Sequence, residues 1–241
     1  MSDCFLPINL PSRCKAYEGI NPEDITIRAY QGRDAIFLSE ISHVNLVQKF
    51  LAVLKNGIIR GIDPENLTLG DRFYIMIWEC INSYVDVVRV PTTCTYCLKD
   101  IDVNVDLKKL NVINLPDDFK QPREVKLPSG KIVKLKLLTV KDEVEIEKFE
   151  EKSDEGYLFR LARSIVDDQD ILMRMEDLRA ASVKDIATIE AFHEKYYHGP
   201  EMITDFECPK CGKEDKLDIP FRLDFLFPHG RALTDTFGEG V

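Results

Sequence analysis

Four of the seven cysteines in this chain form two Cys-x-x-Cys pairs, Cys94 with Cys97 and Cys208 with Cys211. Each pair supplies two thiolates, which is half of the four-ligand shell that a structural zinc ion takes. One Zn²⁺ bound by all four thiolates is the simplest way to complete that shell. Such a site has no open position for water, so it stabilises a fold and does not catalyse a reaction. The sequence therefore predicts a structural Zn²⁺ with Cys94, Cys97, Cys208 and Cys211 as its ligands.

Two other states of the cysteine pairs stay open at the level of the sequence. His193 and His198 precede the second pair and could complete it as a two-Cys two-His site, although Glu79 and Tyr84 occupy the matching places before the first pair. The thiols could also stay reduced and free of metal. A redox dithiol of the thioredoxin kind is disfavoured, because that motif opens a helix after a strand.

The two pairs occupy equivalent positions in what reads as a tandem duplication. Cys94 follows Thr68 at the same separation at which Cys208 follows Ser182, and both hydroxyl residues have an aspartate three positions later. A hydroxyl followed by an acid at this spacing, before an apolar run, is typical of a capped helix start. Helix start and cysteine pair are therefore expected to keep the same relationship in both halves.

The elements expected around the pairs give an α+β fold of two tandem related α/β repeats. A Leu-Pro-Ser sequence opens each repeat pattern, at 10–12 and again at 127–129. A strand, helices and a β-hairpin with a zinc knuckle at its tip are expected to follow, because the residues around each pair alternate between apolar and polar. Apolar spacing predicts helices at 45–55 and 73–84. The shared four-cysteine zinc site would join the repeats.

This organisation predicts four segments along the chain. They are an N-terminal arm at 1–24, a first repeat at 25–115 with its knuckle at 94–97, a second repeat at 116–228 with its knuckle at 208–211, and a flexible C-terminal tail at 229–241. Apolar residues in the arm and before the tail, together with the single tryptophan, are candidate partner contacts, although packing inside the fold would also explain them. The candidates are Phe5, Leu6, Trp78, Phe225, Leu226 and Phe227.

The composition of the 241-residue chain is that of a soluble globular protein, with 44% hydrophobic and 31% charged residues. A net charge of −10 argues against general nucleic-acid binding, which needs a basic surface, and favours protein partners. The lysines at 126–136 alternate with apolar residues and are interpreted as the solvated face of a strand. No apolar run approaches the about 20 residues that span a bilayer, and no secretory signal is expected. The odd cysteine count points to a reducing compartment and metal binding.

The residue patterns of common catalytic sites are absent from the sequence. No phosphate-binding loop, dinucleotide-binding glycine motif or zinc-protease helix occurs, and the four histidines are scattered. The acidic run at 142–154 has the spacing of a solvated helix with Glu–Lys pairs. The chain is therefore predicted not to be an enzyme.

Taken together, these elements resemble the baseplate protein family of T-even-like contractile phages, a family that includes the baseplate hub assembly protein. The cysteine pairs are the most specific part of the resemblance, which covers roughly residues 5–228. Many family members carry a glycine after the first Leu-Pro-Ser sequence, where this chain has Arg13 and Cys14. The other matching segments lie at 10–12, 67–72, Tyr84, 127–130, 139–143 and 208–212.

The resemblance implies a viral protein, made in the bacterial host cytoplasm, that acts in the tail baseplate of the virion in the hub or wedge region. It would be a built-in component or a transient assembly factor without enzymatic activity, in multiple copies if it occupies sixfold positions. Its partners would be other baseplate proteins, with no membrane and no nucleic acid expected.

Two other classes of function stay open. One is a zinc-ribbon binding module that contacts protein or nucleic acid, with the lysines at 126–136 as its phosphate surface. Salt-dependent binding of DNA or RNA would identify it. The other is an enzyme in which water replaces one protein ligand of the zinc, and measurable hydrolase activity would identify that.

Overall fold

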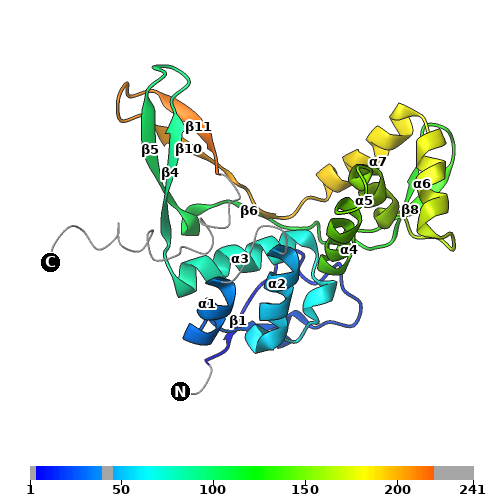
Figure 1. The fold of residues 1–241 in the computed structure, drawn as a ribbon, viewed down its shortest axis with the longest axis horizontal. Coiled ribbons are helices and arrows are strands. Elements are labelled where there is room, and N and C mark those ends of the chain that lie inside the picture. Colours follow the sequence, from blue (N-terminus) through cyan, green and yellow to red (C-terminus); the bar gives the residue numbers. More distant parts are fainter. Residues whose placement is uncertain (1–3, 40–45, 220–241) are drawn as a thin grey trace.

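The computed structural model describes residues 4–39 and 46–219 of this chain, and its helices and short antiparallel sheets confirm the predicted α+β class. Figure 1 shows three groups of elements: helices α1–α3 at the lower left, helices α4–α7 at the right, and two β-hairpins side by side at the upper left. No helix of the described segments is long and apolar enough to cross a membrane.

The first group combines a small antiparallel sheet with three helices. The sheet has the strand order β1-β2-β3, with β1 (Leu6–Pro7), β2 (Thr26–Ile27) and β3 (Ile59–Arg60). The helices are α1 (Gly32–Ser39), α2 (Leu46–Val53) and α3 (Leu69–Ser83). Short 3₁₀ or π turns lie at Pro22–Asp24, Leu54–Ile58 and Pro64–Asn66. The helices predicted at 45–55 and 73–84 correspond to α2 and to most of α3.

The second group begins with a hairpin and continues with four helices. The hairpin pairs β7 (Arg123–Lys126) with β8 (Ile132–Leu135). Its helices are α4 (Val140–Glu150), α5 (Gly156–Ser164), α6 (Ile171–Ala180) and α7 (Val183–Lys195). In β8, Lys134 is exposed while Val133 and Leu135 are buried, which confirms the strand predicted from the alternating lysines.

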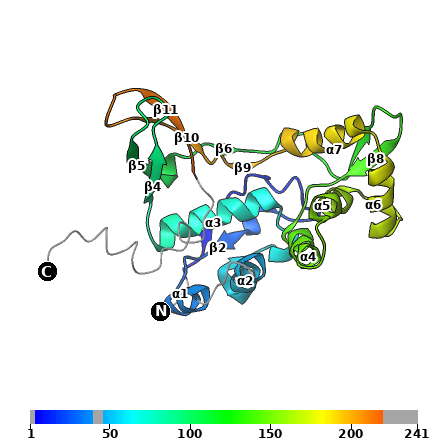
Figure 2. The same ribbon diagram turned by 45° about the horizontal axis from the view of Figure 1, so that its top comes forward.

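The remaining strands connect the two groups. The hairpins pair β4 (Val87–Thr93) with β5 (Asp100–Asp106) and β10 (Ile203–Glu207) with β11 (Glu214–Asp218). A 3₁₀ turn at Leu107–Lys109 follows β5. The chain then passes through β6 (Val112–Ile113), which pairs antiparallel with β9 (Gly199–Pro200). Figure 2 shows this pair between the hairpins and α7.

The predicted helix starts are capped as expected. Thr68 and Ser182 are the N-cap residues of α3 and α7, and each side chain accepts a hydrogen bond from the backbone N–H three residues later. Thr139 and Asp142 form a reciprocal capping box at the start of α4. Caps of this kind satisfy backbone donors that have no partner inside a helix, so they fix where these helices begin.

The two helical groups meet at the N-termini of α3 and α4. Thr68 and Thr139 form an antiparallel bridge, and the N–H of Val140 donates to the carbonyl oxygen of Leu67 at 2.8 Å. About one turn further along each helix, the guanidinium of Arg72 pairs with Glu143. The helix that leads to the first hairpin is thereby fixed to the first helix of the second group.

The buried side chains form two hydrophobic cores. One surrounds α2, α3 and both hairpins, and it includes Leu217 and Ile219 from the end of the second hairpin. The other lies among α4–α7 and the β7–β8 hairpin. The second hairpin therefore packs with the first core, while the domain boundary between residues 115 and 116 stays a prediction.

Part of the predicted N-terminal arm belongs to the body of the protein. Ile8 and Leu10 are buried in the first core, because β1 pairs with β2 and carries them inward. The turn after them places Arg13 at φ 50° and Cys14 at φ 58°, both in the left-handed region that favours glycine. The resemblance to baseplate proteins implies a glycine at this turn, where this chain has these two residues.

Candidate metal centre

The first cysteine pair lies in the turn between β4 and β5. The N–H of Cys94 donates to the carbonyl oxygen of Lys99 at 3.1 Å, and the N–H of Leu98 donates to that of Cys94 at 2.9 Å. These two bonds close a tight turn, so both thiols face the same side. Leu98 is at φ 55°, a left-handed backbone conformation that is strained for a residue other than glycine. The residue is also 77% exposed, so its apolar side chain lies in water.

The second pair lies in the same kind of turn, between β10 and β11. The N–H of Cys208 donates to the carbonyl oxygen of Lys213 at 2.9 Å, and the N–H of Gly212 donates to that of Cys208 at 2.8 Å. Gly212 is at φ 68° and holds the position that Leu98 holds in the first turn. A glycine adopts this conformation without steric cost.

The two turns bring all four thiols into one cluster. The Sγ atoms of Cys94, Cys97, Cys208 and Cys211 lie within 4.8 Å of one another. The separation is 3.8 Å from Cys94 to Cys211 and 3.9 Å from Cys97 to Cys208, much longer than the about 2.05 Å of a disulfide. Four thiolates at the usual Zn–S distance of about 2.3 Å have tetrahedral edges of about 3.8 Å. Two of the thiol separations match this edge and the others do not exceed 4.8 Å, so the four thiols are close enough to share one metal ion.

The pKa values of the two thiols in the second pair are shifted in opposite directions. Burial raises the pKa of Cys208, but backbone N–H groups of Lys210 and Cys211 and the neighbouring thiols lower it to about 7. A backbone N–H of Lys213 lowers the pKa of Cys211, yet burial and the other three thiols raise it to about 11. Four thiolates so close together repel one another, so full ionisation of the cluster needs a bound cation.

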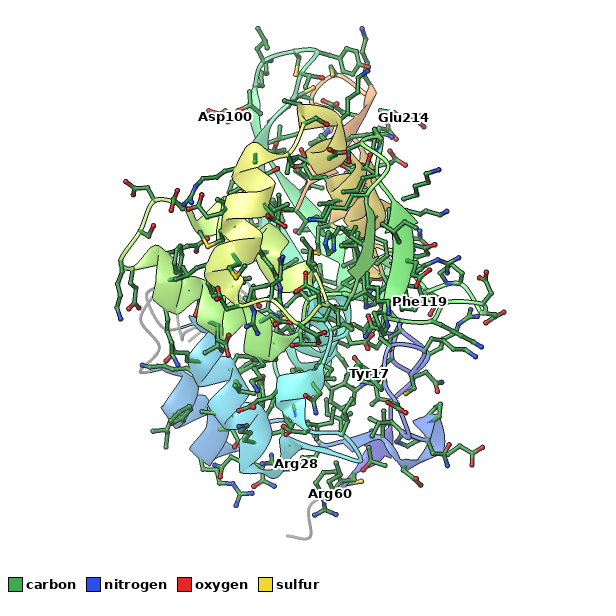
Figure 3. The ribbon with its side chains drawn as sticks, turned by 90° about the vertical axis from the view of Figure 1, so that its right-hand side faces the viewer. Tyr17, Arg28, Arg60, Asp100, Phe119 and Glu214 are labelled. Carbon is green, nitrogen blue, oxygen red and sulfur yellow. The ribbon has the colours of Figure 1, made fainter. Side chains whose placement is uncertain are left out.

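A carboxylate holds the two turns together beside the thiols. Asp215 in β11 accepts hydrogen bonds from the backbone N–H of Thr95 at 2.9 Å and from its hydroxyl at 2.7 Å. The ammonium of Lys213 lies 4.8 Å from the centre of the Tyr96 ring, which is a second contact between the turns. Figure 3 shows Asp100 and Glu214, the first residues of β5 and β11, at the same end of the molecule.

The histidines do not take part in this cluster. Nε2 of His198 lies 2.6 Å from the hydroxyl oxygen of Thr68, and its Nδ1 lies 3.1 Å from the carbonyl oxygen of Tyr196. His193 lines a cavity beside α3 instead. Within the described segments the thiols form the one group of three or more metal-binding side chains, so the two-Cys two-His alternative is wrong.

The other cysteines lie outside the cluster. Cys14 and Cys80 are buried, and burial raises the pKa of each thiol to about 11. Cys4 is exposed.

The predicted partner contacts are dispersed in the structure. Phe5 lies under the guanidinium of Arg60, 3.7 Å from the ring centre, and Leu6 beside it is half exposed. Trp78 is partly buried against the first core, on α3. Phe225, Leu226 and Phe227 lie outside the described residues. Phe5 and Leu6 lie together at the start of β1 and Trp78 lies on α3, so the role of these positions in partner binding stays a proposal.

A model of the family described as T4 bacteriophage base plate protein matches residues 21–227, which include both cysteine pairs. The chain belongs to this T4 baseplate protein family. No curated protein and no solved structure matches the chain. Membership confirms the resemblance to baseplate proteins, and it implies a structural role in the phage baseplate, contact with other baseplate proteins and a place in the virion tail.

Two features of the site in this T4 baseplate family member were not found from the sequence. The Asp215–Thr95 contact depends on how the two hairpins are placed, and an aspartate in a polar strand carries no signal of it. The exposed Leu98 was also missed, although its position matches that of Gly212 in the second pair. A comparison of the two turns residue by residue would have identified it.

Proposed function

We propose that this protein is a non-enzymatic structural or assembly component of a contractile phage tail baseplate, in its hub or wedge region, stabilised by a structural Zn²⁺. The observation that carries the proposal is the family match over residues 21–227. The thiol cluster supports the zinc, because its geometry fits a four-cysteine shell and its like charges need a cation.

The expected contribution of zinc to folding is large. Structural zinc binds with an apparent free energy of about 10–16 kcal/mol at pH 7. That is of the same size as the whole net stability of a typical domain, which is about 5–15 kcal/mol. The ion would tie the two hairpins, which are far apart in sequence, into one unit. A complete shell of thiolates leaves no position for a substrate or water, which supports a role without catalysis.

Tandem duplication of one ancestral unit is part of the proposal. In the first half, the Arg28 guanidinium donates to Asp34 at 2.7 Å, and both side chains are buried. In the second half, the Lys136 ammonium donates to Asp142 at the corresponding helix start. The similar turns around the two cysteine pairs also support a common origin of the halves.

The nucleic-acid alternative receives no support from the basic strand. Lys131 pairs with Asp177 at 2.8 Å, and Lys136 pairs with the buried Asp142. These ion pairs neutralise part of the surface that phosphates would need. Protein contacts through the six candidate residues, and through the exposed Tyr96 and Leu98 at the hairpin tip, are the favoured mode of binding.

Metal analysis tests the zinc site directly. We expect one zinc per chain in purified protein, lost in Cys94→Ser and in Cys208→Ser but kept in Cys4→Ser, which changes an exposed cysteine outside the cluster. Two zinc ions per chain, or zinc retained in either cluster variant, would contradict a single shared ion. An absorption spectrum without visible thiolate-to-metal bands would distinguish zinc from iron.

Phage assembly tests the baseplate role. A phage that lacks this protein should produce tails with absent or incomplete baseplates, and the wild-type protein supplied in trans should restore them in electron micrographs. Complete baseplates in the absence of the protein would contradict the proposal. Mass spectrometry of purified virions then separates a built-in component, which remains in the particle, from a transient assembly factor, which does not.

A further inference from the structure

A cavity of about 500 Å³ lies where α3, α5 and α7 meet, and its lining contains none of the four clustered cysteines. Much of the wall is apolar, with Leu69 and Phe73 from α3 and Leu161 from α5. Tyr157 and Tyr197 also line it and are 55% and 45% exposed, which places them at its rim. The volume is in the range of about 300–1,000 Å³ that is typical of binding sites.

Three basic side chains of the cavity have nitrogen atoms without a hydrogen-bond partner within the described residues. Arg160 makes no hydrogen bond or ion pair within the described residues. The Arg72 side chain is only 8% exposed and pairs with Glu143 at 2.9 Å, but its Nε has no partner. Nε2 of His193 is buried without a partner as well. Since buried polar groups normally have partners, the buried nitrogens of Arg72 and His193 point to a site that is completed by another molecule.

The acidic group of the lining and the tyrosines at the rim are already engaged. The hydroxyl of Tyr157 donates to Glu190 at 2.6 Å, and the hydroxyl of Tyr197 donates to the carbonyl oxygen of Pro200 at 2.7 Å. Both rings are therefore held in place before anything binds, which reduces the entropy lost on binding. Tyrosine and arginine are also among the side chains that are enriched in binding hot spots.

We propose that this cavity docks a segment of a neighbouring protein that presents a carboxylate next to a large apolar side chain. The apolar side chain would fill the space beside Phe73 and Leu161, and the carboxylate would accept hydrogen bonds from Arg160, Arg72 and His193. An arginine can bind a carboxylate through two parallel bonds, and it does so most strongly where water is excluded. The inference rests on the proposed function only for the identity of the partner as another baseplate protein.

The charge of His193 is consistent with this occupant. Burial lowers the pKa of His193, and the nearby Arg160 guanidinium lowers it further. A neutral imidazole donates a single N–H, and a bound carboxylate would favour its protonation. Binding should therefore raise the pKa of His193, which is a readout that a purely apolar occupant would not produce.

Titration with a small probe tests the cavity in the full-length zinc-loaded protein. The probe is 3-phenylpropionate, which joins an aromatic ring to a carboxylate, and the matched neutral compound is 3-phenylpropionamide. We expect saturable NMR shifts of the His193 and Tyr157 side chains with the acid, and at least tenfold weaker binding of the amide. Arg160→Gln should weaken binding of the acid at least tenfold and leave the amide unchanged.

The control variant is Lys184→Gln, which makes the same charge change at an exposed position of α7 outside the cavity. It should bind the acid as the wild type does. The proposal is overturned if the acid gives no saturable shift up to 20 mM, if acid and amide bind equally, or if Arg160→Gln has no effect. Arg160 has no partner to lose within the described residues, so its replacement is expected to leave the fold intact, and a thermal melt checks this.

Photo-crosslinking tests the partner in infected cells during assembly. Tyr157 is replaced by p-benzoylphenylalanine, and Leu172, which is exposed on α6 outside the cavity, serves as the control position. From position 157 we expect cross-links to a baseplate protein, at a segment where a carboxylate lies next to a large apolar residue. Cross-links to a basic segment, to a second copy of this chain or to nothing overturn the docking proposal. The titration tests carboxylate binding in the cavity independently of the baseplate role, so the two proposals can fail separately.

Discussion

The backbone N–H of Ser12 donates a hydrogen bond of 2.8 Å to the Oδ1 atom of Asp71. The matching bond in the second half runs from the N–H of Ser129 to Oδ1 of Asp185, at 3.0 Å. Each aspartate is in the first turn of the helix that leads to a cysteine hairpin. In both halves the serine of the Leu-Pro-Ser turn therefore holds the start of the helix in place through this hydrogen bond. The bond is a physical reason for the Leu-Pro-Ser sequence to occur twice.

Replacement of Asp71 should cost more stability than replacement of its counterpart. Asp71 also accepts a hydrogen bond from the hydroxyl of Tyr17, so Asp71→Ala would leave the buried Ser12 N–H without a partner and leave the Tyr17 hydroxyl only its longer bond to Thr68. A buried donor that is left without a partner lowers the free energy of unfolding by roughly 1–3 kcal/mol. Urea unfolding of zinc-saturated protein should show a larger loss for Asp71→Ala than for Asp185→Ala. Asp118→Ala, at an exposed turn, is the control and should change little. Equal losses for all three variants would contradict the assignment.

Gly70 should be intolerant of even a methyl group. A Cβ atom at this position would lie 2.2 Å from the carbonyl oxygen of His198, on the segment that leads into β9. Such a clash forces the backbones apart, at a cost of about 1–3 kcal/mol. Gly32 is the matched control, because it also lies in the first turn of a helix but a methyl group there would meet nothing within 4 Å. Thermal unfolding should therefore show a large loss for Gly70→Ala and little change, or a gain, for Gly32→Ala.

The local features of this fold could be predicted from the sequence. The caps at Thr68 and Ser182 follow from a hydroxyl three residues before an acid, because that spacing satisfies free N–H groups at a helix start. The tight turns at the cysteine pairs follow from the residues on both sides, which alternate between apolar and polar as in strands. The closeness of all four thiols follows from the chemistry of zinc, which needs four ligands when each pair has two.

The contacts between distant segments could not be predicted in the same way. Thr68 and His198 are 130 residues apart, and neither has a neighbourhood that specifies the other. The sharing of one core by α3 and both hairpins depends on shape and volume, which a pattern of apolar residues does not fix. The cavity beside α3 arises from the same packing. Its Arg160 looks like an ordinary cationic position on an amphipathic helix until its surroundings are known.

Glu79 should make the protein less stable as the pH rises. Burial raises its pKa from 4.5 to about 8, although the Ser83 hydroxyl donates to the carboxylate and lowers it. Between these values the folded state binds more protons than the unfolded state, so the free energy of unfolding falls as pH increases. The limiting slope for one group is about 1.4 kcal/mol per pH unit. The contribution of protonated Glu79 to the free energy of unfolding is fully present below pH 4.5 and is lost by about pH 8.

The variant Glu79→Gln isolates this effect, because an amide does not titrate. We expect it to be more stable than the wild type at pH 9 and to lose that advantage at pH 5, as measured by urea unfolding at saturating zinc. Glu18→Gln, at an exposed position, is the control and should follow the wild type at both values. A constant difference between Glu79→Gln and the wild type across this range would show that Glu79 does not carry the pH dependence.

Asp215 should preorganise the metal site without binding the metal. Its carboxylate holds the N–H and hydroxyl of Thr95 in the opposite turn, so Asp215→Ala lets the two hairpins separate before zinc binds. Loss of such an outer contact typically weakens metal binding by about 10–100-fold, and competition with a chromophoric chelator measures it. Asp205→Ala, on the neighbouring strand β10, is the control and should keep the wild-type affinity.

The pH dependence of the same contact has the opposite sign to that of Glu79. The Thr95 hydroxyl and backbone N–H lower the pKa of Asp215, because they donate to its ionised form. Its contribution to stability is therefore present above the ordinary range of an aspartate and is lost as the pH falls through the lowered pKa. Asp215→Asn keeps the shape but not the charge, so zinc affinity should fall less than in Asp215→Ala. If both variants bind zinc as tightly as the wild type, the contact of Asp215 with Thr95 does not preorganise the metal site.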